Sequence, residues 1–166
     1  EFAKGTTPVT LATVDGAGAI MGVHKGEVTF TATYGEQSGT LTETVGCQYP
    51  SFPAAIRFNN ALPPLGWDGA YWGDGTQLDF SFEDFYCERE WDDYTSAIIM
   101  VKAAWCTPCT QYAQQRLNPA SASLREDGAL IVYVEAQELD GLPADNAYAN
   151  QHMRRIIGDG WGIRVG

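Results

Sequence analysis

The sequence predicts an α/β domain that follows an all-β segment at the N-terminal end of the chain. Three observations support this. Residues 27–34 alternate between polar and apolar side chains, which is typical of a half-buried strand. Residues 96–103 and 129–135 are compact apolar runs of strand length, and a helical stretch follows each of them, at 110–117 and at 145–157. A Cys-x-x-Cys motif stands where the first of these runs meets its helix.

The composition indicates a globular, acidic protein. Of the 166 residues, 45% are hydrophobic and 19% are charged, which favours a packed core over disorder. Lys and Arg number 10 against 21 Asp and Glu, a formal net charge of −11. This excess repels phosphate backbones and anionic lipid head groups, so we expect no nucleic-acid or membrane-surface partner. The longest uncharged apolar stretch, residues 96–101, is too short for a membrane span.

Residues 1–45 form the expected β segment, rich in Thr, Val, Ala and Gly. Turn signals precede and follow the strand at 27–34, and one face of this strand carries Val28, Phe30, Ala32 and Tyr34. The run made of Ala12–Asp15, Gly18, Ile20–Val23 and Gly26–Tyr34 resembles the second half of a group 2 bacterial immunoglobulin-like module. Such modules are stalk and spacer units of bacterial surface proteins. The resemblance implies a partial module, which would bury its inner face poorly.

Residues 46–166 form the second expected domain. A loop-rich stretch runs to Leu78, and an acidic segment follows at 83–93. The apolar run at 96–103 is expected to be buried on both faces of a sheet. The helix after it should end before Pro119, because a proline disfavours helical geometry in the residue before it.

The last helical stretch has signals at both ends. Asp145 can cap its N-terminus, Arg154 and Arg155 suit its last turn, and Gly158 can end it. We expect no strand or helix in the tail at 160–166. The order strand, helix, strand, helix predicts a βαβ unit with a parallel pair of strands and a right-handed crossover.

The pair Cys106 and Cys109 is the strongest chemical signal in the chain. A thiol at a helix N-terminus meets free backbone N–H groups and the positive end of the helix dipole, so we expect the pKa of Cys106 to be lowered. Pro108 suits the first helical turn. Cys109, three residues on, can attack a mixed disulfide formed at Cys106. We therefore expect an exposed Cys106 as the nucleophile, Cys109 as the resolving thiol, and Trp105 as an apolar shield beside them.

The segment Val101–Cys109 resembles the active-site segment of the thioredoxin superfamily, and above all the extracytoplasmic TlpA/ResA-like thiol-disulfide oxidoreductases. The stretch from Leu62 to Phe80 resembles the β-hairpin that precedes the thioredoxin core in that branch. The resemblance implies an α/β thioredoxin-like fold, incomplete here, behind the immunoglobulin-like fragment. The cis-proline loop, two strands and a final helix of the family would lie beyond Gly166.

The motif departs from the family in two further places. Met100 stands where thioredoxins carry a buried Asp that serves proton transfer, so Glu135 or water would have to move the proton. Thr107 replaces the thioredoxin Gly.

Two other functions of the motif are disfavoured. A zinc site needs a second pair of ligands, and His24 and His152 are isolated; a peroxiredoxin normally has Thr where Ala103 stands.

Cys47 and Cys87 lie 40 residues apart. A second redox pair or a pair of metal ligands is one interpretation, and free thiols are another. We favour a structural disulfide, because the carboxylates around Cys87 would raise its pKa and slow its reactions. Disulfide use and a surface-type spacer indicate a bacterial, extracytoplasmic location, whether periplasmic, cell-surface or secreted.

The sequence thus predicts an enzyme that catalyses thiol–disulfide exchange on protein substrates through its Cys-Thr-Pro-Cys pair. It needs no cofactor and no metal, because the two sulfurs carry the electrons. Its partners would be protein thiols or disulfides and an upstream electron donor or acceptor. The alternative is a bacterial surface or adhesion spacer whose thioredoxin-like domain is catalytically idle.

Overall fold

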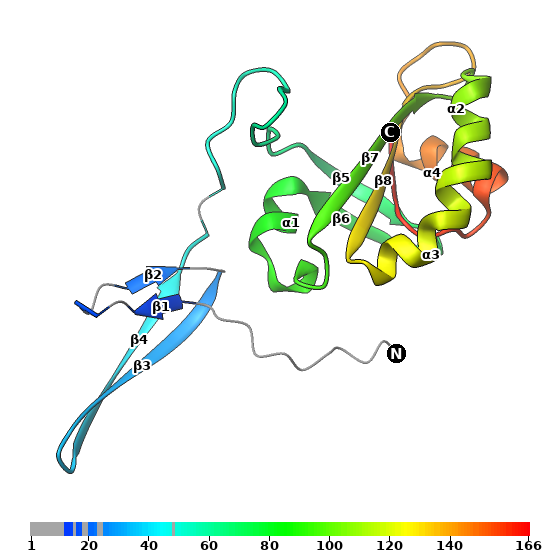
Figure 1. Cartoon of the computed structure of the whole chain (residues 1–166). Coiled ribbons are helices and arrows are strands. Elements are labelled where there is room, and N and C mark those ends of the chain that lie inside the picture. The colour runs from blue at the N-terminus through cyan, green and yellow to red at the C-terminus, as the bar shows by residue number, and fades with distance from the viewer. Residues whose placement is uncertain (1–11, 15, 18–19, 23–24, 48) are drawn as a thin grey trace. The chain divides into compact units, whose positions relative to one another are not determined.

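The structure is a computed structural model that describes residues 12–14, 16–17, 20–22, 25–47 and 49–166 (Figure 1). It is mixed α/β, as the sequence predicts. The chain divides into two compact units, the first made of residues 1–63 and 83–90 and the second of residues 64–82 and 91–166. Four residues cited above lie outside the described residues: Asp15, Gly18, Val23 and His24.

The first unit contains, among the described residues, two antiparallel pairs of strands: β1 (Ala12–Val14) with β2 (Ile20–Gly22), and β3 (Gly26–Tyr34) with β4 (Gln37–Val45). The predicted strand at 27–34 is confirmed by β3. Across the β3–β4 pair, Phe30 stands opposite Leu41, and the Thr29 and Thr42 hydroxyls hydrogen-bond at 3.0 Å. No third strand joins this pair within the described part of the chain, so the hairpin is a two-stranded ribbon.

A disulfide and an ion pair join the end of α1 (Phe82–Cys87) to the residues on either side of the β3–β4 hairpin. Cys87 is joined to Cys47, with 5.5 Å between the two Cα atoms. The Lys25 ammonium donates a hydrogen bond of 2.6 Å to the Glu88 carboxylate, which raises the pKa of Lys25. These contacts explain why this part of the acidic segment belongs with the β strands, a division that differs from the expected boundary after residue 45.

A five-stranded sheet with the order β6–β5–β9–β8–β7 forms the second unit. Its strands are β5 (Gly66–Trp72), β6 (Gln77–Ser81), β7 (Ser96–Ala103), β8 (Ala129–Gln137) and β9 (Ile163–Val165). The predicted parallel pair is confirmed, because β7 runs parallel to β8. The β5–β6 hairpin lies where the resemblance implies a β-hairpin, within the stretch that the composition indicates to be loop-rich. Aromatic packing explains it, since the Trp67 and Phe80 rings stack across the two strands.

Two helical segments cover one face of this sheet. Between β7 and β8 the chain forms α2 (Thr107–Tyr112), a π-helical turn (Ala113–Leu117) and α3 (Asn118–Glu126), and α4 (Asn146–Ile157) lies between β8 and β9. A buried cluster joins the helices to β8: Ala113, Leu117, Ile131, Tyr133, Met153 and Ile157. Because Ile131 and Tyr133 are two residues apart on β8, they point to the same face, so both helical segments pack on that face (Figure 1).

The α4 helix has the ends that its sequence predicts. The Asp145 carboxylate accepts a hydrogen bond of 2.7 Å from the Tyr148 backbone N–H, which is the predicted N-cap. Gly158 ends the helix with φ at 66°, a left-handed conformation that favours glycine. Arg154 and Arg155 stand in the last turn, near the negative end of the helix dipole.

The predicted end of the first helix before Pro119 is wrong. The helical path continues through the proline to Glu126. The π-helical turn explains this, because the Asn118 backbone N–H donates to the Ala113 carbonyl, five residues earlier. The wider turn comes just before a residue that has no N–H to donate. Pro119 then occupies the first turn of α3, where its missing donor costs little.

The prediction that residues 160–166 form no strand is also wrong. The β9 strand lies between β5 and β8, and it is fully buried. Its central residue, Arg164, interrupts the apolar run by which a buried strand is recognised, because arginine is rarely buried. The Arg164 guanidinium donates to the Gly158 carbonyl at 2.7 Å and to the Asn150 side chain at 3.2 Å. Gly158 directly follows α4, so this end of the guanidinium lies near the negative end of that helix.

The β7 strand is less buried than predicted. It is the last strand of the sheet, and Val101 is 63% exposed. The β8 strand, by contrast, is buried from Ala129 to Tyr133. The difference follows from position, because β8 has a strand on each side and β7 has one within the described part of the chain.

Tyr133 should make the fold sensitive to alkali. Its ring is fully buried, its hydroxyl has no hydrogen-bond partner among the described residues, and burial raises its pKa to about 12. The unfolded chain loses the Tyr133 proton near pH 10, whereas the folded chain keeps it until about pH 12. The stability that depends on this proton is therefore fully present below pH 10 and is lost as the pH rises toward 12. Between pH 9 and 11, we expect the free energy of unfolding to fall by about 1.3 kcal/mol more than in Tyr133→Phe.

Urea unfolding of both proteins across that pH range measures the difference. At neutral pH the phenylalanine variant should be at least as stable as the parent, because it removes a buried hydroxyl that has no partner. Parallel pH profiles for the two proteins would contradict this account of Tyr133.

Candidate functional site

The Cys106–Cys109 segment connects the end of β7 to the start of α2. Hydrogen bonds fix this connection: the Ala104 N–H donates to the Gln137 carbonyl at 2.8 Å, and the Cys106 N–H donates to the Ala103 carbonyl at 3.0 Å. Cys106 is the N-cap residue, with extended backbone angles, and the helix begins at the next residue. The predicted helix start at the Cys-x-x-Cys motif is therefore confirmed.

A disulfide joins Cys106 and Cys109, and their Cα atoms are 5.3 Å apart. The structure thus contains the oxidised state of the pair. Both cysteines are half-buried, so Cys106 is less exposed than expected. Pro108 stands in the first turn of α2, as predicted, and it is exposed. Reduction of this bond would leave Cys106 at the helix N-terminus and Cys109 within the first turn.

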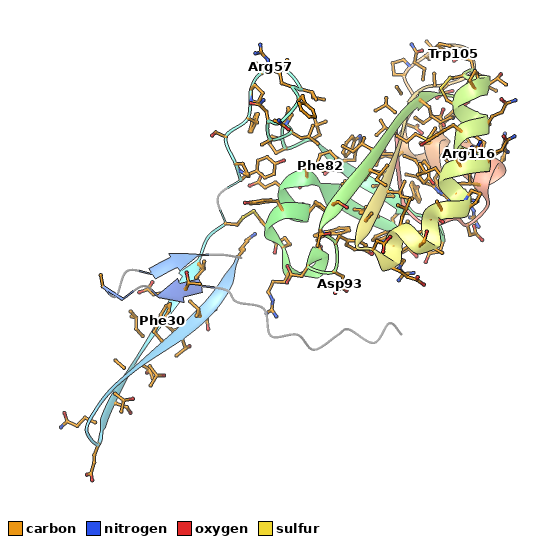
Figure 2. All side chains as sticks on the ribbon, in the orientation of Figure 1. Phe30, Arg57, Phe82, Asp93, Trp105 and Arg116 are labelled. Carbon is orange, nitrogen blue, oxygen red and sulfur yellow. A yellow bond between two sulfur atoms is a disulfide. The ribbon has the colours of Figure 1, made fainter. Side chains whose placement is uncertain are left out.

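Trp105 lies beside the disulfide and is 58% exposed. Its indole N–H donates a hydrogen bond of 3.1 Å to the Gln137 side-chain oxygen, which orients the ring. The β7–β8 register shifts between Lys102 and Ala103, so that Ala103 pairs with Gln137. This irregularity brings the end of β8 next to the Trp105 segment. Figure 2 labels Trp105 at the end of the sheet where α2 begins.

A buried charged cluster lies near the same end of the sheet. Lys102 on β7 and Glu135 on β8 are direct partners in the register, and their side chains are fully buried. The Lys102 ammonium lies 2.7 Å and 2.8 Å from the two Glu135 oxygens. On α4, His152 places Nδ1 2.9 Å from Glu135, and its side chain is 16% exposed. The cluster therefore connects a fully buried ion pair to a ring that reaches the surface.

The cluster and the disulfide belong to the same side of the sheet. Glu135 follows Tyr133 by two residues on β8, so it points to the face that the helices cover. Lys102 precedes Cys106 by only four residues, and an extended chain of that length spans at most about 14 Å. Of the three residues in this cluster, the sequence identifies Glu135 alone as a candidate. A lysine inside an otherwise apolar strand is the signal that points to Lys102.

The other cysteine pair, Cys47 and Cys87, forms a disulfide of its own within the first unit. Cys87 is almost fully buried. All four cysteines are in disulfides. Within the described residues, no group of three or more His, Cys, Asp or Glu side chains is arranged to hold a metal ion.

None of the helices in the described part of the chain has the length and apolar character that crossing a membrane requires. In the comparisons with known proteins, no family model, no curated protein and no solved structure matches this chain.

Proposed function

We propose that the chain carries out thiol–disulfide exchange on protein substrates through Cys106 and Cys109. The observation that carries this proposal is their half-buried disulfide at the first turn of a helix, directly after a strand of a parallel pair. This position gives a reduced Cys106 the N-terminal N–H groups and the helix dipole as stabilising neighbours. A disulfide that closes so short a loop constrains the unfolded chain little, which favours a chemical role over a structural one.

The exchange transfers two electrons. The Cys106 thiolate attacks one sulfur of a substrate disulfide, the substrate S–S bond breaks, and the departing thiolate takes a proton. Cys109 then loses its proton and attacks the Cys106 sulfur. This attack releases the second substrate thiol and forms the Cys106–Cys109 bond that the structure contains. A dithiol donor returns the pair to its reduced state, and the reverse sequence oxidises a substrate dithiol.

Glu135 is the proton acceptor that this proposal assigns to Cys109, acting through water. Its position supports this role, because Glu135 lies on the sheet face that the helical segments cover, and Cys109 belongs to one of these segments. His152 gives the cluster a route to solvent. The role replaces that of the buried Asp in thioredoxins, where this chain has Met100.

The proposal includes a thioredoxin-like domain behind an immunoglobulin-like module. The order of strand, Cys-x-x-Cys helix, parallel strand and helix supports the first, and the β3–β4 hairpin supports the second. Two disulfides support an oxidising, extracytoplasmic location in a bacterium.

Alkylation at graded pH tests the proposal. After mild reduction that frees two thiols, we expect Cys106 to react with iodoacetamide at pH values well below the ordinary thiol pKa of about 8.5. Peptide mass spectrometry identifies the labelled cysteine, and Cys109 of the same molecule serves as the internal control. If Cys106 titrates like a free thiol and the reduced chain transfers no electrons to a disulfide, the alternative of a spacer with an idle domain stands instead.

A further inference from the structure

Resting on the proposed function, we infer that the substrate is an apolar, uncharged or basic polypeptide segment that carries a disulfide, and that the loop after β8 recognises it. This loop, residues 138–145, connects β8 to α4. It exposes two large apolar side chains, Leu139 at 66% and Leu142 at 61%. Neither leucine is needed to fill the core of its own unit, because more than half of each remains in contact with solvent.

The loop belongs to the surroundings of the disulfide. Gln137, directly before it, accepts the Trp105 indole hydrogen bond and the Ala104 backbone hydrogen bond. Tyr112 lies three residues after Cys109 on α2, on the same side of the helix, and is 55% exposed. Two exposed aromatic rings and two exposed leucines thus belong to the segment that holds the disulfide and to the loop linked to it through Gln137.

The backbone of the loop is fixed before any substrate arrives. The Glu138 N–H donates to the Leu142 carbonyl at 2.8 Å, and the Gly141 N–H donates to the Glu138 carbonyl at 3.1 Å. The Leu139 N–H donates to the Tyr148 hydroxyl at 3.1 Å, and the Leu142 N–H donates to the Asp140 carboxylate at 3.1 Å. A loop ordered in this way loses little conformational entropy when a partner covers its leucines, which favours binding.

The charges around the disulfide select among possible partners. Residues 103–115, which include the disulfide, and the loop at 138–145 contain no Lys or Arg, and the loop contributes Glu138, Asp140 and Asp145. Arg116 is the first basic residue along the helical path from Cys106, ten residues on (Figure 2). An anionic disulfide such as glutathione disulfide is therefore repelled, whereas an apolar or basic polypeptide meets contacts of matching character.

Single-turnover kinetics test the inference. The chain, reduced to two free thiols and freed of reductant, is mixed with two synthetic peptide disulfides that differ only in having leucines or glutamates beside the cystine. We expect the leucine peptide to be reduced about tenfold faster. In Leu139→Ser/Leu142→Ser that advantage should fall below about threefold. The matched control is Leu41→Ser, which changes an exposed leucine on β4 of the first unit.

A second variant tests the charges. Glu138→Gln/Asp140→Asn keeps the side-chain oxygen that accepts the Leu142 hydrogen bond, and it should accelerate reduction of glutathione disulfide about fivefold at low salt. Equal rates for the two peptides with the parent chain, or an unchanged preference in the leucine variant, would overturn the inference. When one of these contrary results is obtained, cystamine separates the two proposals. If the chain still reduces cystamine, the inference alone fails; if it reduces no disulfide at all, the proposed function fails as well.

Discussion

Replacing Cys106 with serine is expected to slow disulfide reduction by at least about a thousandfold, because a serine hydroxyl stays protonated at neutral pH and cannot replace a thiolate nucleophile. Single-turnover reduction of a peptide disulfide by the reduced chain measures this. Cys109→Ser should behave differently. It keeps the attacking thiol and lacks the resolving thiol, so a mixed disulfide between Cys106 and the substrate should accumulate.

Mass spectrometry distinguishes the two roles, because the mixed disulfide adds one substrate thiol to the mass of the chain. If the adduct instead accumulates in Cys106→Ser, the assigned roles are reversed. The matched control is the combined change Cys47→Ser/Cys87→Ser, which removes the disulfide of the first unit. It should leave the reaction at Cys106 intact, and circular dichroism reports whether that variant is folded.

The second large effect is on stability. Lys102→Met should lower the free energy of unfolding by about 3–5 kcal/mol, because it leaves the Glu135 carboxylate buried without its cation. Urea unfolding of the oxidised chain at pH 7 gives the value. Lys25→Met is the matched control. It breaks a surface ion pair with Glu88, which water screens, and it should change the stability little.

A double variant tests whether Lys102 and Glu135 stabilise the fold as a pair. In Lys102→Met/Glu135→Met both charges are removed, and we expect most of the stability lost in Lys102→Met to return. The double-mutant cycle therefore predicts strong coupling between the two positions. Losses that simply add would show that the two charges act independently, against the contacts of 2.7 Å and 2.8 Å between them.

The sequence predicts those elements whose signals are local. The Asp145 cap, the Gly158 end of α4 and the alternation in β3 are all readable within a few residues. It fails where distant contacts decide the outcome. The helix continues through Pro119 because a π-helical turn precedes the proline, and β9 forms because two neighbouring strands and α4 surround Arg164. Neither feature has a sequence pattern that outweighs proline or a central arginine.

The candidate site divides in the same way. Cys106, Pro108 and Cys109 are identified by their spacing and their place before a helix. The Lys102–Glu135–His152 cluster draws its members from two strands and a helix, spread over 50 residues of sequence. Only the β7–β8 register and the position of α4 bring them together. The exposed leucines of the loop after β8 could not be recognised either, because exposure depends on how the loop folds.

The disulfide between Cys47 and Cys87 closes a covalent ring of main chain that contains both strands of the β5–β6 hairpin. Both cysteines belong to the first unit, whereas the hairpin is part of the sheet of the second. The chain therefore leaves the first unit and returns to it within the ring. A protease that cuts the main chain once between Cys47 and Cys87 leaves both fragments joined by the disulfide, so in oxidising surroundings cleavage before β5 does not release one unit from the other.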